Sequence, residues 1–155
     1  MKAICSCHGQ PIVNNQNDIV SILLEDDHSR SYLMMPVRMK NDGSADVLVN
    51  KDKKDFEKDK DSEEVKSVWT SLNTYRTFKK KTYGYFKALI DLSAELCLGR
   101  NGKALANLQD MYNFDTVKII VKDRKLPYDV RALFMRILLN MHMDREPLEP
   151  IQIPS

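Results

Sequence analysis

Residues 126–145 constrain the fold most, because their large apolar side chains recur at the spacing of an α-helix. Steps of three and four place these side chains along one side of a helix: Val130, Leu133, Phe134, Ile137, Leu138 and Met141. Pro127 suits the first helical position, where its missing N–H costs nothing. Arg131, Arg136 and Asn140 fall on other faces. The pattern predicts a helix that buries a wide stripe against neighbouring helices.

The composition is that of one domain with a modest core, in a chain of 155 residues. The 24 basic and 22 acidic side chains are interspersed and leave a net charge of +2, which gives no reason to expect nucleic acid or an anionic membrane as a partner. No apolar run reaches the roughly 20 residues of a membrane-spanning helix, and no apolar secretory stretch follows Met1. Three cysteines favour a reducing compartment over a disulfide framework. We expect these residues to be soluble.

Both ends of the sequence look like cut elements. Residues 2–7 are typical of the last turn of a helix, with Gly9 suited to the left-handed conformation that stops it. At the other end Pro147, Pro150 and Pro154 favour an extended tail. We therefore interpret the chain as a piece of a longer polypeptide.

The first half of the chain predicts one short helix and one hairpin. Apolar residues preceded by an asparagine-rich run predict a helix over about 16–25, capped by one of the asparagine side chains. Two apolar stretches, Tyr32–Met39 and Val47–Val49, flank a turn signal at 41–44 and predict a small β-hairpin. Pro36 restricts its first strand to an edge. A lone hairpin is marginally stable, so we expect it to lie against the helices.

The middle of the chain carries a charged run and an ambiguous segment. Residues 51–66 contain one aromatic among six lysines and seven acidic residues, which predicts a flexible surface loop. Residues 65–75 fit either a helix, from the spacing of Val68 and Leu72, or a strand, from Thr70 and neighbouring residues. We favour the helix.

The second half is predicted to contain three amphipathic helices joined by short connections. The first runs from about residue 82 and ends at Gly99 or Gly102. The second is capped by Asp115, ends near Asp123 and buries Val117, Ile120 and Val121. The third is the helix of residues 126–145. Consecutive helices of this kind pack antiparallel, and pairs stacked in series form an α-solenoid.

One cluster, Cys5 with Cys7 and His8, hints at a metal. A structural zinc site needs four ligands, and no second pair has a suitable spacing because His28 and His142 are isolated. Two cysteines two positions apart on a helix also point to different sides. We favour ordinary helix-end cysteines over metal or redox chemistry.

Two basic segments invite a functional interpretation. Arg76–Lys81, flanked by Tyr75, Phe78 and Tyr83, could receive a phosphate or an acidic partner, although the solvated start of a helix is the favoured interpretation. Gly99–Lys103 superficially resembles a phosphate loop, but it follows a helix where a strand is required. It is better interpreted as a turn between helices.

No other pattern indicates catalysis. Cys97 falls on the apolar stripe of its helix and is predicted to be a core residue, and no rigid carboxylate pair is available for acid–base work. The methionines favour adaptable packing over a partner groove: Met34, Met35, Met135, Met141 and Met143 among eight. We predict no catalytic, cofactor, ligand-binding or metal residues.

Two stretches, ELCLGRNGKAL (95–105) and KLPYDVRALFMRILLNMHMDREP (125–147), resemble the inositol trisphosphate receptors, in the RIH domain region that these channels share with ryanodine receptors. In that family a helix ending in Cys-Leu-x-Arg is followed, after a spacer, by Leu-Pro-Tyr-Asp-x-Arg-Ala and a His-x-Asp-Arg-x-Pro ending. The matching positions are Cys97, Leu98 and Arg100, then Leu126, Pro127, Tyr128, Asp129, Arg131 and Ala132, and finally His142, Asp144, Arg145 and Pro147. The match covers about residues 82–150. The first half resembles both receptor types at Cys5, Gly9, Pro11, Asn15 and Gln16.

The resemblance implies an armadillo-like solenoid segment on the cytosolic side of a tetrameric calcium-release channel of the endoplasmic reticulum membrane. The family's ligand pocket is built from basic residues that precede this region, so no ligand-binding residue carries over to this chain. The implied function is to relay ligand binding to pore opening, with neighbouring domains of the same polypeptide as partners, and inositol trisphosphate and calcium acting through other regions.

Two alternatives to that function remain. One is the equivalent segment of a ryanodine receptor. The other is a free-standing helical scaffold that binds partner proteins along a concave face. An enzyme ranks behind both, because no catalytic constellation was found.

Overall fold

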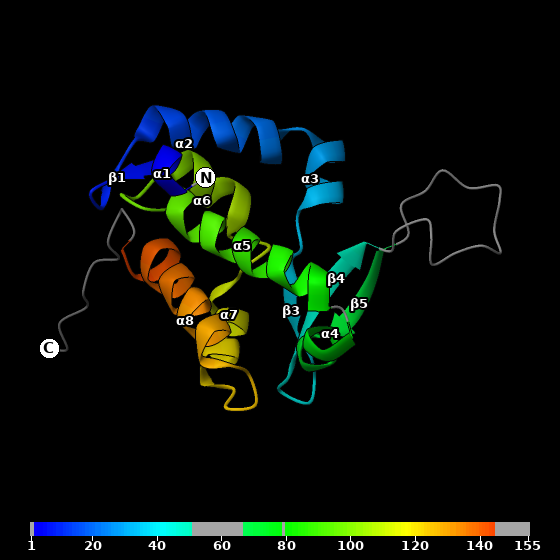
Figure 1. The fold of residues 1–155 in the computed structure, drawn as a ribbon. Helices are drawn as coiled ribbons and strands as arrows, with labels where there is room; N and C mark the ends of the chain where they lie inside the picture. Colours follow the sequence, from blue (N-terminus) through cyan, green and yellow to red (C-terminus); the bar gives the residue numbers. More distant parts are fainter. Residues whose placement is uncertain (1, 51–66, 79, 145–155) are drawn as a thin grey trace, which may run out of the picture.

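The computed structural model describes residues 2–50, 67–78 and 80–144, which are mostly helical with a small antiparallel sheet (Figure 1). The predicted flexible loop at 51–66 and the predicted proline-rich tail lie outside these residues. The helices are α1 (Lys2–Cys5), α2 (Val13–Val20), α3 (Asp27–Leu33), α4 (Leu72–Phe78), α5 (Lys80–Leu96), α6 (Gly102–Leu108), α7 (Phe114–Lys122) and α8 (Tyr128–Ile137). Two π-helical segments, η1 (Ser21–Glu25) and η3 (Leu138–Met143), extend α2 and α8. The strands are β1 (Ser6–Cys7), β2 (Gln10–Pro11), β3 (Val37–Met39), β4 (Ala45–Asn50) and β5 (Ser67–Ser71).

The predicted hairpin is confirmed as strands β3 and β4. They pair antiparallel with Val37 opposite Val47, and the sheet order β3-β4-β5 makes β3 an edge strand, as Pro36 before it requires. The third strand, β5, pairs with the other side of β4 and places Val68 opposite Val49. The sheet therefore has one more strand than the sequence predicted.

Residues 65–75 combine both alternatives that the sequence left open. Strand β5 covers Ser67–Ser71, and helix α4 begins directly afterwards at Leu72. The favoured helix is therefore wrong for β5 and right from Leu72 onward. Pairing with β4 satisfies the backbone groups of a segment rich in β-branched and aromatic residues, which outweighs its weak helical spacing.

The helix predicted over 16–25 exists but begins earlier, at Val13. Its N-cap residue, Ile12, makes no side-chain capping bond, so the predicted asparagine cap is wrong. Asn15 Nδ2 instead donates to the carbonyl oxygen of Ile4, at 2.8 Å, and ties α2 to α1. The local pattern assigned an asparagine side chain to the cap, whereas in the structure Asn15 makes a tertiary contact.

Helix α3 was not predicted, and part of it was assigned to the first strand of the hairpin. Asp26 caps it by accepting a hydrogen bond from Ser29 N at 2.7 Å. None of its residues is buried, so it carries no apolar periodicity that a sequence pattern could detect.

The N-terminal turn differs from the predicted helix end. Helix α1 stops at Cys5, and the next residues form a two-stranded ladder, Ser6 with Pro11 and Cys7 with Gln10. The two residues between the strands have positive φ, 50° at His8 and 76° at Gly9. Gly9 is left-handed as expected, but it closes a tight hairpin instead of ending a helix.

Helix α5 begins at Lys80, two residues before the predicted start, and a turn with Gly99 at φ 75° follows it. The sequence missed helix α6, which begins at Gly102. Its cap is Asn101, whose Oδ1 accepts a hydrogen bond from Ala104 N at 3.1 Å. The described second half therefore has four helices where three were predicted.

Helix α7 has the predicted extent but a different cap. Asn113 accepts a hydrogen bond from Thr116 N at 3.0 Å, while Asp115 lies in the first turn. Val117 and Ile120 are buried as predicted, although the third expected member, Val121, is only partly buried. The asparagine reaches the free N–H groups because it is the residue just before the first turn.

Helix α8 carries the predicted stripe. Its members Val130, Phe134, Ile137 and Met141 are buried, while Leu133 and Leu138 are partly buried against the same core. Pro127 precedes the helix as its N-cap residue, with extended ψ of 154°, instead of opening it. Asn140, which the spacing places on another face than the stripe, is also buried.

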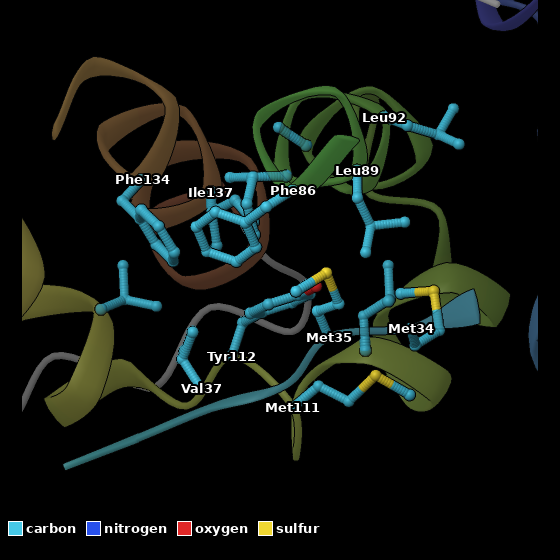
Figure 2. Packing of buried hydrophobic residues seen from close by; sticks show 14 of the residues in the cluster. Met34, Met35, Val37, Phe86, Leu89, Leu92, Met111, Tyr112, Phe134 and Ile137 are labelled. Carbon is cyan, nitrogen blue, oxygen red and sulfur yellow. The ribbon is translucent and has the colours of Figure 1, made fainter. Parts of the chain in front are cut away.

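The core lies between α5, α8 and the segments that cross beneath them (Figure 2). The ring centre of Phe134 on α8 lies 6.1 Å from the ring centre of Phe86 on α5 and 6.4 Å from the ring centre of Tyr112. Met34 and Met35 close the core near strand β3 (Figure 2). The inner stripe of α8 is therefore covered by this chain itself, and a solenoid stays a prediction.

Candidate functional site

The cysteines divide between the core and the surface. Cys5 and Cys97 are buried free thiols, and Cys7 is exposed. Burial raises the pKa of Cys97 to about 12, so the thiol stays protonated and inert near neutral pH, as expected of a core residue. Burial, and then the charge of Glu95, raise the pKa of Cys5.

Neither a membrane-spanning helix nor a metal-binding cluster occurs among the described residues. No helix among them is long and apolar enough to cross a membrane. They also bring together no group of three or more His, Cys, Asp or Glu side chains suited to a metal ion.

The most connected polar feature is a set of side chains around the C-terminal half of α5, which we call the polar junction. It contains Gln16 of α2, Asp91 and Glu95 of α5, Asn101 before α6, Arg136 of α8 and Asn140 of η3. These residues are buried or partly buried, and they join elements that lie far apart in the sequence.

One half of the polar junction is uncharged. Gln16 Nε2 donates to the carbonyl oxygens of Glu95, at 2.8 Å, and Leu98, at 3.1 Å, which lie in the last turn of α5 and just after it. Asn101 Nδ2 donates to Gln16 Oε1 at 3.1 Å and to Asn17 Oδ1 at 3.0 Å. Helix α2 is thereby bonded to the end of α5 and to the start of α6.

The other half is ionic. The guanidinium of Arg136 donates to the carboxylates of both Asp91 and Glu95, which lie one turn apart on α5. Ser6 Oγ donates to the second carboxylate oxygen of Glu95 at 3.1 Å. Since Glu95 is buried, this pairing offsets the cost of removing its charge from water. Asn140 Nδ2 adds a bond to the carbonyl oxygen of Ala94 at 2.9 Å.

The polar junction was not predicted from the sequence. Gln16 lies one turn before buried Val20, and Asn140 is next to buried Met141, so each polar side chain interrupts an apolar helix stripe. Such an interruption was the available signal, because buried polar groups need hydrogen-bond partners. The partners themselves come from other elements and leave no local pattern.

The basic segment at 76–81 forms no described site. Tyr75 and Tyr83 on its flanks are buried, and their rings meet edge to face at 6.1 Å. The side chains of 77–81 lie outside the described residues. The loop after α5 leads into α6, where Lys103 Nζ donates to Ser21 Oγ at 2.6 Å and is paired with Glu25 at 3.1 Å. That loop joins two helices, as predicted.

Comparison with known proteins yields a distant relation. No family model matches the chain. The inositol 1,4,5-trisphosphate receptor-like protein A of Dictyostelium discoideum is 24% identical over 148 residues, which cover 95% of this chain but 4% of that protein. The likeness supports a distant relation to the inositol trisphosphate receptors.

Some of the residues that carry the resemblance to inositol trisphosphate receptors make polar connections between distant segments of this chain. Arg100 Nε donates to Asp144 Oδ1 at 2.8 Å, which brings together two motifs that lie 44 residues apart. His142 Nε2 lies 2.8 Å from the carbonyl oxygen of Tyr112. The motif positions thus have a structural role in this chain.

The motif at the start of α8 fixes that helix on both sides. Lys87 Nζ of α5 donates to Asp129 at 2.7 Å, and this bond lowers the pKa of the Asp129 carboxyl group. Arg131 Nε donates to the carbonyl oxygen of Val121 on α7 at 2.8 Å. Helix α8 is therefore held to α5 and α7 by side chains of one motif.

Proposed function

We propose that this chain is a non-catalytic coupling segment of a ligand-gated intracellular calcium-release channel of the inositol trisphosphate receptor kind. It would lie on the cytosolic side of the endoplasmic reticulum membrane, in a channel that assembles as a homotetramer. The observation that carries the proposal is the likeness along 95% of the chain to a receptor-like protein. Because the chain covers 4% of that protein, inositol trisphosphate and calcium would act through regions outside it.

The polar junction supplies a physical means of coupling. Arg136 bridges two carboxylates one helical turn apart, so a shift of α8 along α5 by about one turn, roughly 5.4 Å, would keep one of its two ion pairs and break the other. A packing with two arrangements of similar energy can be biased by ligand binding elsewhere. In this proposal, a neighbouring domain of the same polypeptide shifts the balance between the two arrangements, and another neighbouring domain responds to the shift.

The test uses Arg136→Met in the full-length protein expressed in cells. Loss of both ion pairs should leave inositol trisphosphate affinity within about twofold while calcium release from the endoplasmic reticulum falls by roughly tenfold, a coupling change of about 1.4 kcal/mol. The matched control is Arg38→Met, which removes a cation paired with one carboxylate, Asp46, within the sheet. Release should then stay near wild type.

Two outcomes would contradict the coupling proposal. One is equal loss of ligand affinity and release, which indicates a binding role. The other is normal release from a protein whose ion pairs are gone. Circular dichroism and thermal melting of the 155-residue chain establish that both variants fold. Fractionation of cells tests whether the full-length protein is located in the endoplasmic reticulum membrane.

A further inference from the structure

The outer side of α8 and η3 is apolar and exposed. Tyr128 is 85% exposed, Met135 49%, Leu139 52% and Met143 62%. Steps of seven, four and four residues place them on one side of the helix, away from the buried stripe. The described residues of this chain leave these side chains exposed, and together they form an apolar strip.

A groove between α7 and α8 borders this strip. It has a volume of about 560 Å³ and is lined by Lys118, Val121, Lys122, Arg124, Arg131, Met135 and Leu138. Met135 belongs to both the groove and the exposed strip, so the two form one surface. We call the two together the α7–α8 surface.

The charges of the groove have one sign. Its lining, drawn from the described residues, contains four cations and no carboxylate. The bond from Arg131 Nε to Val121 holds one guanidinium in place, and Lys118 Nζ lies 5.4 Å from the ring centre of Phe114. Arg136 of the same helix differs from these cations, because it lies outside the groove lining and is already paired with two carboxylates of this chain. The groove therefore offers fixed positive charge beside apolar side chains.

We propose that the α7–α8 surface binds an amphipathic helix with an apolar edge flanked by carboxylates. The apolar edge would pack on Met135 and Leu139, and the carboxylates would meet Lys118 and Lys122. The charge complementarity selects an acidic partner, and the apolar floor favours a helix over a small anion, which gains nothing from apolar contact. This proposal does not depend on the channel function.

The test measures binding of a fluorescent synthetic helix to the 155-residue chain by anisotropy. The probe is an 18-residue peptide with leucines at helical spacing and glutamates on both flanks, and its comparison peptide has lysines in place of the glutamates. The acidic peptide should bind, with an affinity that falls as salt rises, and the basic peptide should not.

Two pairs of variants locate the binding. Lys122→Glu in the groove should weaken binding roughly tenfold, while Lys40→Glu, the same charge change in the hairpin turn, should leave it within about twofold. Met135→Gln should weaken binding, while Met39→Gln on the edge strand should not. The second pair is matched, because Met135 is 49% exposed and Met39 is 50% exposed.

Several results would overturn the proposal. Equal binding of both peptides, or equal effects of the paired variants, would place the contact elsewhere. Displacement of the probe by inorganic pyrophosphate at low millimolar concentration, with no effect of Met135→Gln, would indicate a simple anion site. Concentration-dependent dimers that bury Met135 and exclude the probe would make a second copy the occupant.

Discussion

The two sides of α8 and η3 are both apolar, but the described part of the chain covers only one of them. On the inner side Phe134 and Ile137 are fully buried against α5 and the core, whereas on the outer side Met135 and Leu139 are about half exposed. A helix with one apolar stripe belongs at the surface of a domain, and a helix that is apolar all round belongs in an interior. Helix α8 lies between these cases, which is the pattern expected of a helix with a partner on each side.

The difference teaches that burial follows the neighbours of a residue and not its type alone. Phe134 has aromatic rings of Phe86 and Tyr112 beside it, so its removal would leave a cavity. Met135, the next residue, is turned by about 100° around the helix and is already half exposed to water. The contrast between the two sides can be tested with substitutions of known type.

The largest expected effect is on the inner side. Phe134→Ala should lower the free energy of unfolding by about 3 to 5 kcal/mol, because a fully buried aromatic side chain leaves an unfilled cavity. Met135→Ala is the neighbouring control and should cost less than about 1 kcal/mol. Urea unfolding of the 155-residue chain, followed by circular dichroism, measures both. Similar losses in the two variants would remove the distinction between the sides.

A smaller effect is expected from alkaline pH, which probes the covered side through Cys97. The pKa of this thiol is raised from 9.0 to about 12 in the folded chain, so the unfolded chain loses the proton first. Its contribution to stability is fully present below pH 9 and is lost as pH rises through the window to about 12. Urea unfolding at a series of pH values measures this loss of folding stability.

The control for the pH effect is Cys97→Ala, whose stability should fall less steeply between pH 9 and pH 10. At pH 8, a thiol reagent should label exposed Cys7 in the folded chain and reach Cys97 only after unfolding. Rapid labelling of Cys97 without unfolding would contradict the closed core that the inner side of α8 requires.

The smallest effect is expected on the outer side. Leu139→Gln should change the free energy of unfolding by less than about 0.5 kcal/mol, because the side chain is half exposed and no cavity or unpaired buried group results. Leu108→Gln places the same substitution at a fully buried site and should be strongly destabilising. Thermal melting compares the two. A large loss at Leu139 would indicate that the outer side is covered in solution, and sedimentation would identify self-association as the cause.

Sequence patterns predicted the parts of the fold that depend on local spacing. The stripe of α8, the hairpin of β3 and β4 and the burial of Cys97 follow from apolar periodicity or turn chemistry, which the sequence displays directly. Helices α3 and α6 were missed because short helices with few buried residues have weak periodicity. Strand β5 was the less favoured alternative for its segment, because its pairing with β4 is a contact between residues distant in the sequence and leaves no local pattern.

The candidate site was less predictable than the fold. Gln16 and Asn101 could have been flagged as polar residues in or beside apolar stripes, but their meeting requires α2 to lie on the end of α5. The ionic half depends equally on the position of α8, since Arg136 and its partners are 41 and 45 residues apart. Resemblance singled out neighbouring residues, such as Arg100, without indicating that they pair with other helices.

By itself the sequence determined that α8 carries apolar residues at helical spacing, because a 3.6-residue period is a property of consecutive side chains. Only the tertiary structure decided which of its sides is covered, and by which elements, because burial depends on segments brought together from distant parts of the chain. The same holds for Arg136, whose charge is evident in the sequence and whose partners are set by the packing of α8 on α5.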